Sequence, residues 1–432
     1  MSGAGAAALA LPQRAFASAD EYGRARQDYF SGEALYRDVV AYASFGEHRT
    51  ATDADVRTSR WLAEQLAAAG AEARLVPWRS QQFFIRDHAL SVAGSPVESF
   101  PLWWPRPTGP EPLVASLAAI ETGAGAGALA ERIGLVVLPP VGGAQIVAGN
   151  GVAEIVAEAA AQGARALVLV IRHRTGEIVA LNAMAGLRPW PIPVLQVGQR
   201  DEAQLAAAAA AGESVSFLLD GALDYRAEAF EVVGTAGSGE AQVVVSTPSS
   251  GWFRCAGERG PGIALWLALA RWAAASPIPA RFTFVASSGH ELDSVGIRHF
   301  LAYDAPPPAA VATWLHLGAG IATYDYELGA DGPRRLDRPF AGRRLMTNQE
   351  ELVAELREAF ADLAGLEPIL TPEPGGEMVA MADMGYRVWG FAGGSVYHHI
   401  PSDLPERTTG PELLEPVARA VVRTLEQLVE RR

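Results

Sequence analysis

The chain has 432 residues and a formal net charge of −14, from 49 acidic and 35 basic side chains. Such an acidic balance leaves no general basic field, so we expect neither nucleic acid nor a membrane surface as a partner. No apolar run approaches the roughly 18 residues of a membrane helix, and the single Cys255 cannot form an internal disulfide, so we expect a soluble protein.

Residues 1–31 predict a leader ahead of the folded part. Residues 4–11 are apolar, and the following Ala15-Phe16-Ala17 has the small residues of a cleavage site. A secretory signal opens with basic residues, however, and Arg14 comes only after the apolar stretch. We therefore expect a frayed, alanine-rich leader and a cytoplasmic rather than a secreted protein, with a signal peptide as the alternative.

The first helix of the folded part is expected at residues 53–70. Leu62 and Leu66 fall on one face of this segment, and Gly70 is placed to end it. A short strand is expected next, at residues 73–77.

Residues 79–221 predict an inserted, self-contained α/β module, because short strands alternate with helices over this length. The expected elements are a proline-rich loop at 100–112, strands at 133–138, 166–171, 191–197 and 215–219, and helices at 152–162 and 201–211.

Residues 32–78 and 222–432 predict the larger α/β domain. Strands are expected at 242–246, 281–286, 310–317 and 386–391, and helices at 260–275, at 347–364 and along the amphipathic C-terminal segment. Glu350 completes a capping box for the second helix, and Gly365 is placed to end it. Apolar strands separated by helices imply a mostly parallel central sheet covered by helices on both faces.

Polar side chains gather where these strands are expected to end, which is the edge at which such sheets place their chemistry. Two carboxylates and up to four imidazoles there could converge on one cation, and this mixture of nitrogen and oxygen ligands favours zinc. The residues concerned are Glu258, His290, Glu291, His316, His398 and His399, with Trp252 and Arg259 beside them.

This layout resembles the zinc aminopeptidases that share a clan with glutaminyl cyclases and glutamate carboxypeptidases. The insert resembles the protease-associated domain of many of them, and the resemblance covers nearly the whole chain from about Gly32. Its most specific piece is His399-Ile400-Pro401-Ser402-Asp403, which matches the family's His-Thr-Pro-x-Asp. The segment Gly289-His290-Glu291-Leu292, with Gly296, is similar to the family's Glu-Glu-x-Gly-x-x-Gly pattern.

Several positions that bind two zinc ions in typical members differ in this chain. Thr247 and Ser249 replace an early His-x-Asp pair, Glu258 replaces a bridging Asp, His290 replaces the catalytic Glu, and His316 replaces a later Asp. The resemblance therefore implies one divalent ion, expected to be zinc, held by Glu258, Glu291 and His399, with His316 as a further ligand or a core histidine.

The remaining roles follow from the same resemblance. His290 would shuttle protons in place of the family's carboxylate, or would be a lost base that only hydrogen-bonds a neighbour. Glu377 lies in a loop that is near the substrate in the family and could bind an amine, or it is an ordinary exposed carboxylate.

Three further residues have two readings each. Arg259 could hold a substrate carboxylate or pair with Glu258. Trp252 could line the pocket or lie in the core. His398, on an extended segment, would point away from its neighbour His399.

These features predict a divergent metal-dependent hydrolase that acts on an amide-type C–N bond in a small peptide-like substrate. A related alternative is intramolecular acyl transfer, as in the glutaminyl cyclases. The rival from another class is a non-catalytic binding protein that kept the fold and lost the metal. The sequence leaves the substrate, the oligomeric state and the position of the insert relative to the site open.

Overall fold

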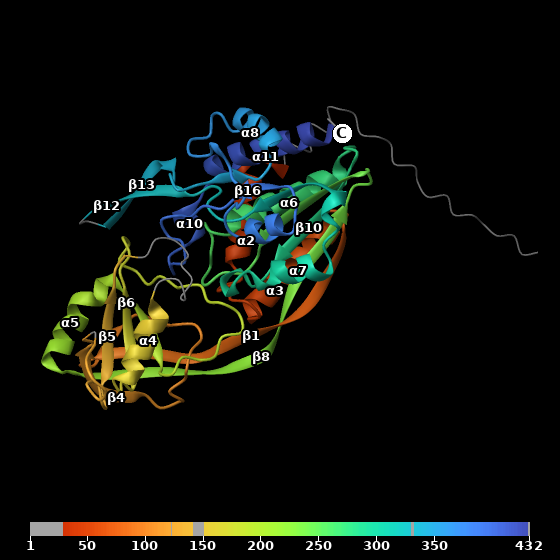
Figure 1. Ribbon diagram of the computed structural model, residues 1–432. Helices are drawn as coiled ribbons and strands as arrows, with labels where there is room; N and C mark the ends of the chain where they lie inside the picture. Colours follow the sequence, from red (N-terminus) through yellow and green to blue (C-terminus); the bar gives the residue numbers. More distant parts are fainter. Residues whose placement is uncertain (1–28, 122, 141–150, 330–331, 431–432) are drawn as a thin grey trace, which may run out of the picture.

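The computed structural model describes residues 29–121, 123–140, 151–329 and 332–430 (Figure 1). Most of the predicted leader therefore lies outside the described residues, and the cytoplasmic location stays a prediction. The last residues of the leader pack onto the fold, because Phe30 is buried with its ring 6.4 Å from that of Trp272. Ser31 then caps α2 (Gly32–Ala43) by accepting a hydrogen bond from the Ala34 amide. No helix in these ranges is long and apolar enough to cross a membrane.

The larger part of the chain is built on one sheet. Its strand order is β15 (Pro368–Leu370), β14 (Leu345–Thr347), β16 (Val388–Phe391), β11 (Val311–Leu317), β9 (Ala241–Pro248), β10 (Ala280–Ser287), β8 (Ser214–Ala236) and β1 (Glu72–Val92). The central strands β16, β11, β9 and β10 pair in parallel, as do β14 and β15. Strands β14 and β8 pair antiparallel with their neighbours β16 and β10.

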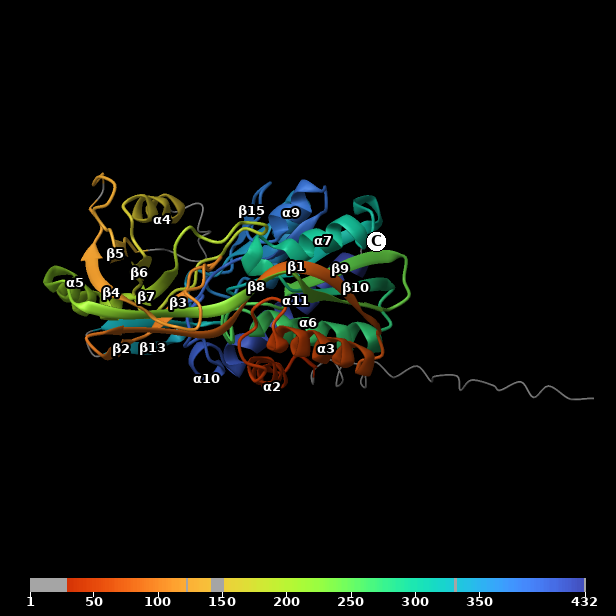
Figure 2. The ribbon, with the colours of Figure 1, turned by 90° about the horizontal axis from the view of Figure 1, so that it is seen from below.

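Helices cover both faces of this sheet (Figure 2). One face carries α2, α3 (Asp53–Ala68), α6 (Gly260–Ala275) and α11 (Pro411–Glu430), and the other carries α7 (Val295–Tyr303) and α9 (Met378–Asp383). Because successive side chains of a strand point to opposite faces, Phe282 and Phe284 of β10 join the core under α6, whereas Val285 joins the core under α7. The predicted fold class, a mostly parallel α/β sheet covered on both faces, is confirmed.

The insert adds its own strands at the far end of β8. These are β2 (Ser95–Val97), β3 (Ser99–Pro101), β4 (Leu113–Ala119), β5 (Ile133–Leu138), β6 (Ala166–Ile171) and β7 (Val194–Gly198), with helices α4 (Val152–Ala161) and α5 (Glu202–Ala211). Strands β5, β6 and β7 and helices α4 and α5 lie close to where the sequence predicts them, whereas β4 was not expected; β4 to β7 pair in parallel. The likeness to a protease-associated domain and the division at residues 79 and 221 stay predictions.

Two long strands join the insert to the larger part. The strands expected at 73–77 and 215–219 are pieces of β1 and β8, which pair antiparallel from Glu72 opposite Thr235 to Val92 opposite Val215. The sequence hides this length because polar residues such as Arg79, Gln81 and Asp220 interrupt the apolar alternation.

The helix expected at 347–364 is wrong over much of its length. Thr347 ends β14, and only a short turn, η5 (Glu350–Leu352), and α8 (Val353–Ala359) are helical. No capping box forms, because the Thr347 hydroxyl accepts a hydrogen bond from the Gln349 amide and donates one to the Val388 carbonyl. Pairing of β14 with β15 and β16 overrides the local helical pattern.

The remaining elements are short and were not expected. They are a hairpin of β12 (Tyr324–Gly329) and β13 (Gly332–Pro339), the single turns η2 (Gln199–Asp201), η3 (His290–Leu292) and η4 (Pro308–Ala310), and α10 (Pro405–Thr408).

Candidate functional site

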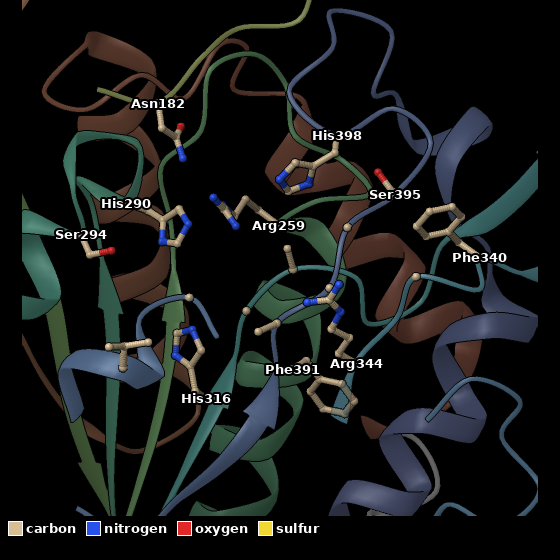
Figure 3. A pocket seen from close by; sticks show the side chains of 18 of the residues that line it. Asn182, Arg259, His290, Ser294, His316, Phe340, Arg344, Phe391, Ser395 and His398 are labelled. Atoms are coloured by element: carbon tan, nitrogen blue, oxygen red, sulfur yellow. The ribbon is translucent and has the colours of Figure 1, made fainter. Parts of the chain in front are cut away.

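The carboxyl ends of β9, β10, β11 and β16 meet at one edge of the sheet, beside a cavity of about 810 Å³ (Figure 3). His316 reaches this cavity from the end of β11, and His290 from the turn after β10. Arg259 comes from the start of α6 and His398 from the segment after β16. The insert contributes Asn182. Residues far apart in the sequence thus surround one hollow.

Arg259 lies between two buried carboxylates. Its Nη2 is 2.8 Å from Glu258 Oε1 and 2.7 Å from Glu291 Oε1, and its Nε donates to the Ser250 carbonyl. Burial alone would raise the pKa of Glu258, but Arg259 and the two nearby histidines hold it well below its usual range. Burial likewise opposes the charge of Arg259, yet the two carboxylates raise its pKa. Both partners are therefore charged at neutral pH.

Glu291 is occupied on both oxygens. Its Oε1 accepts from Arg259, and its Oε2 accepts a 2.7 Å hydrogen bond from the Ser250 hydroxyl. That hydroxyl in turn accepts from the Gly289 amide at 2.9 Å. The predicted metal ligand Glu291 thus has a full set of protein partners.

The loop that carries Glu258 is held by Asp403, the last residue of the motif that begins at His399. The Asp403 carboxylate accepts hydrogen bonds from the Gly257 amide at 2.6 Å and the Glu258 amide at 3.0 Å. Position 257 requires glycine, because a Cβ there would lie 2.7 Å from Thr408 Oγ1 and 3.0 Å from Asp403.

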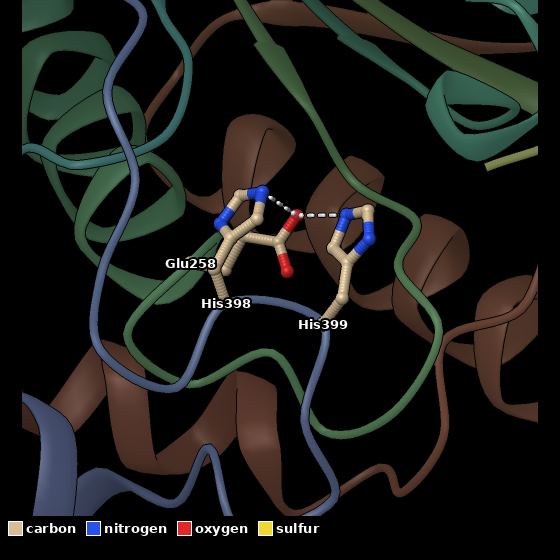
Figure 4. A group of neighbouring side chains, drawn as sticks. All are labelled: Glu258, His398 and His399. Carbon is tan, nitrogen blue, oxygen red and sulfur yellow. Dashed lines mark ion pairs between the residues drawn. The ribbon is translucent and has the colours of Figure 1, made fainter. Parts of the chain in front are cut away.

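His399 and His398 both face Glu258 (Figure 4). His399 Nε2 lies 3.3 Å and His398 Nε2 lies 3.8 Å from Glu258 Oε1. The expectation that His398 points away from His399 is wrong. His399 has a φ of 60°, so the chain turns instead of extending, and the two rings stack with centroids 4.4 Å apart.

These three side chains form a donor set suited to a cation. Glu258, His398 and His399 are the one group in the described ranges whose possible ligand atoms all lie within 4.8 Å of one another. Both Glu258 oxygens and His399 Nε2 are buried, and although Glu258 Oε1 makes ion-pair contacts with Arg259 and His399, none of these three atoms forms a hydrogen bond with good geometry. His399 Nδ1 donates to the Ala180 carbonyl at 2.9 Å, which leaves Nε2 free as a ligand. One carboxylate and two imidazoles are ligands that zinc prefers, so the residues fit that metal.

A second cluster lies across the cavity. His290 Nδ1 is 3.0 Å from Glu377 Oε1, and His316 Nε2 is 3.9 Å from Glu377 Oε2. Burial would raise the pKa of Glu377, but the hydrogen bond to His290 and the neighbouring histidines and Arg259 lower it. Glu377 is fully buried, so the reading as an exposed carboxylate is wrong.

His316 belongs to this second cluster and not to the group around Glu258. Its Nδ1 bonds the Ser246 hydroxyl at 2.9 Å, and that hydroxyl accepts from the Trp314 indole. Burial lowers the pKa of His316 to about 4, so its ring is neutral at neutral pH.

Trp252 lies behind the cavity and does not line it. It packs edge-on against Trp103, with ring centroids 5.0 Å apart, and against Phe100. Its indole N–H donates to Asn182 Oδ1 at 2.8 Å. Trp252 would therefore act on a substrate only through Asn182, which does line the cavity.

From the sequence we did not expect Asn182 or Ser250 at the site, and His398 was not among the cation ligands that the resemblance implies. Ser250 carried a usable signal, because it follows a strand next to the other polar residues. Asn182 carried none, because it lies in the insert and reaches the site only through tertiary packing.

No protein-family model matches the chain, and no curated protein matches it in sequence. Solved structures do match. A zinc aminopeptidase from Bacillus subtilis superposes with a TM-score of 0.70 at 16% identity, covering 93% of this chain and 95% of its own. A peptidase M28 precursor from Shewanella amazonensis gives a TM-score of 0.72 at 15% identity, covering 95% and 96%. An aminopeptidase from Aneurinibacillus gives 0.62 at 15% identity, covering 93% and 95%.

The likeness extends over nearly the full length of each chain and is a likeness of fold. The protein therefore has the fold of the zinc aminopeptidases, as the sequence motifs predict.

Proposed function

We propose that the protein hydrolyses an amide-type C–N bond in a small peptide-like substrate, with one divalent ion, zinc, at the cavity. One observation carries this proposal: a histidine–carboxylate pair, His290 with Glu377, borders the same cavity as His398, which belongs to the cation-binding group.

Glu258, His398 and His399 would hold the ion, which differs from the predicted set in that His398 replaces Glu291 and His316. When bound, such an ion supplies a Lewis acid that polarises a carbonyl oxygen. The charges of the buried groups support a divalent ion. Glu258, Glu291 and Glu377 are three buried carboxylates, and Arg259 balances one of their three negative charges, so the neighbouring histidines or a cation must balance the rest.

His290 is the proton carrier in this proposal. Its Nδ1 is bonded to Glu377, so its Nε2 is left to take a proton from the attacking water and return it to the leaving amine. Glu377 keeps the imidazole in one orientation and stabilises its protonated form, because the carboxylate is buried and charged.

The test measures hydrolysis of aminoacyl and dipeptidyl amides by zinc-loaded protein, together with metal content by mass spectrometry. His290→Ala should lower turnover by about 10² to 10⁴-fold at unchanged metal content. Glu377→Gln should lower turnover less, since it keeps the size and one acceptor. His173→Ala is the matched control, because the half-buried His173 lies in the insert and, within the described residues, its ring bonds only Thr175. Unchanged turnover in His290→Ala overturns the assigned role.

A second candidate is a non-catalytic binding protein, and Arg259 is the observation that favours it. A guanidinium already contacts both Glu258 and Glu291, which are the carboxylates expected to bind the metal, and balances one of their two negative charges. Purified protein with no bound metal, and no thermal stabilisation on adding zinc, would favour this candidate over the hydrolase.

A further inference from the structure

One segment of the insert, residues 178–183, is packed directly against the site. Ala180 bonds His399 twice, through its amide to the His399 carbonyl and through its carbonyl to the His399 ring. The Ala183 amide donates to the Glu291 carbonyl at 2.9 Å. All six side chains of the segment are buried. The insert therefore holds His399 and Glu291 in place, and Asn182 lies in the sequence between the two residues that bond them, Ala180 and Ala183.

The orientation of the Asn182 side chain is fixed by Trp252. An indole N–H is a donor only, so the atom that it bonds must be the amide oxygen of Asn182. Trp252 is itself held by the rings of Phe100 and Trp103. The Asn182 amide nitrogen is consequently the free end, and Figure 3 shows it pointing toward His290 and Arg259.

This free end has no protein acceptor in the described part of the chain. Asn182 is only 7% exposed, yet it lines the cavity, and no hydrogen bond from its Nδ2 is formed. Asn182 Nδ2 is open to the cavity and its orientation is fixed, so this unused donor is available to a ligand acceptor there.

We propose that Asn182 binds the substrate, by donating from Nδ2 to a main-chain carbonyl oxygen of a peptide in the cavity. This inference rests on the proposed function for its substrate class. A carbonyl fits better than a cation or an amine, because the amide nitrogen can only donate. The insert thus supplies one side of the binding site, and the larger domain supplies the proton carrier and the cation ligands.

The test separates binding from turnover. Binding of N-acetylated, C-amidated tripeptides is measured by calorimetry to zinc-loaded protein carrying His290→Ala, so that any hydrolysis is about 10² to 10⁴-fold slower during the titration. Asn182→Asp keeps an acceptor for Trp252 and replaces the donor by a negative oxygen. It should weaken binding by about 10-fold to 100-fold, the range for a buried hydrogen-bond partner left unsatisfied.

Two further variants distinguish binding from stability. Trp252→Phe keeps an aromatic ring beside Phe100 and Trp103 but removes the indole donor, so it should weaken binding less than Asn182→Asp and add little to it in the double variant. Asn348→Asp is the matched control, because both ends of Asn348 already bond the Tyr386 and Val388 backbone away from the cavity. It should leave peptide affinity unchanged.

Equal peptide affinity in Asn182→Asp and in its parent overturns the inference, whatever the stability of the variant. Asn182→Asp is also made without the His290 change. If that variant binds the peptides more weakly while the wild-type protein hydrolyses none of them, the proposed function is overturned and the binding role of Asn182 is supported. Failure of every tripeptide to bind the parent protein overturns the assignment of Asn182 to a peptide carbonyl.

Discussion

Replacing Arg259 by Gln tests how the site balances its charges. The change removes a buried cation that contacts Glu258 at 2.8 Å and Glu291 at 2.7 Å. Removing one partner of a buried ion pair costs about 3–5 kcal/mol, because the other charge is left uncompensated. Unfolding entropy is about 2.1 cal/mol/K per residue, so for 432 residues this loss lowers Tm by about 3–6 °C.

Added zinc should restore part of this loss. Without the guanidinium, the carboxylates of Glu258 and Glu291 and the ring of His399 can share one cation. A ligand at 100 times its Kd stabilises the folded state by about 2.7 kcal/mol, which returns about 3 °C. The zinc-induced rise in Tm should therefore be larger in Arg259→Gln than in the wild type.

The assay is scanning calorimetry of chelator-treated protein with and without zinc. Arg343→Gln is the matched control, because Arg343 is also buried but donates to the backbone carbonyls of Ile321 and Ala364 and pairs with no carboxylate among the described residues. It should lose stability with no zinc-dependent recovery beyond that of the wild type. Equal zinc responses in the two variants, or no loss of stability in Arg259→Gln, would refute the reasoning.

Three other outcomes are expected. His399→Ala should remove the bound metal, since Glu258 and His398 alone make a poor zinc site; one ion per chain in that variant, measured by mass spectrometry, contradicts the ligand set. Burial raises the pKa of Asp55 to about 7 against hydrogen bonds from the Ala51 amide and the Ser288 hydroxyl, so the folded state holds this proton more tightly than the unfolded chain. Its contribution to the free energy of unfolding is present at low pH and is lost as pH rises from about 4 to 7, and denaturant titrations should show that Asp55→Asn lacks this component. Limited proteolysis should cut near Arg79 or within 220–226 and leave a compact insert fragment, and cleavage only inside the insert speaks against that division.

Much of the fold could be predicted from the sequence, because local apolar periodicity marks elements that are buried on one or both sides. The helix expected at 260–275 and the buried strand at 166–171 have the bounds that the structure gives. The gathering of polar side chains was also predictable, since parallel strands end at one edge of the sheet, where His316 lies near the end of β11 and His290 and His399 follow β10 and β16. In these cases the information lies within a dozen neighbouring residues.

Only the tertiary structure decided which side chains meet. Arg259 comes to lie between Glu258 and Glu291, and His398 turns toward Glu258 because His399 adopts a left-handed backbone. Asn182 meets Trp252 across 70 positions of sequence. The sequence offered the pairing of Arg259 with its neighbour Glu258 as one of two readings. Spacing along the chain carries no information on the contacts with Glu291, His398 and Asn182, because each depends on how separately formed elements pack. The sequence determined the fold and the edge of the sheet at which the candidate site lies. Packing decided the partner of each charge, because a buried charged group takes the oppositely charged group that the fold brings nearest.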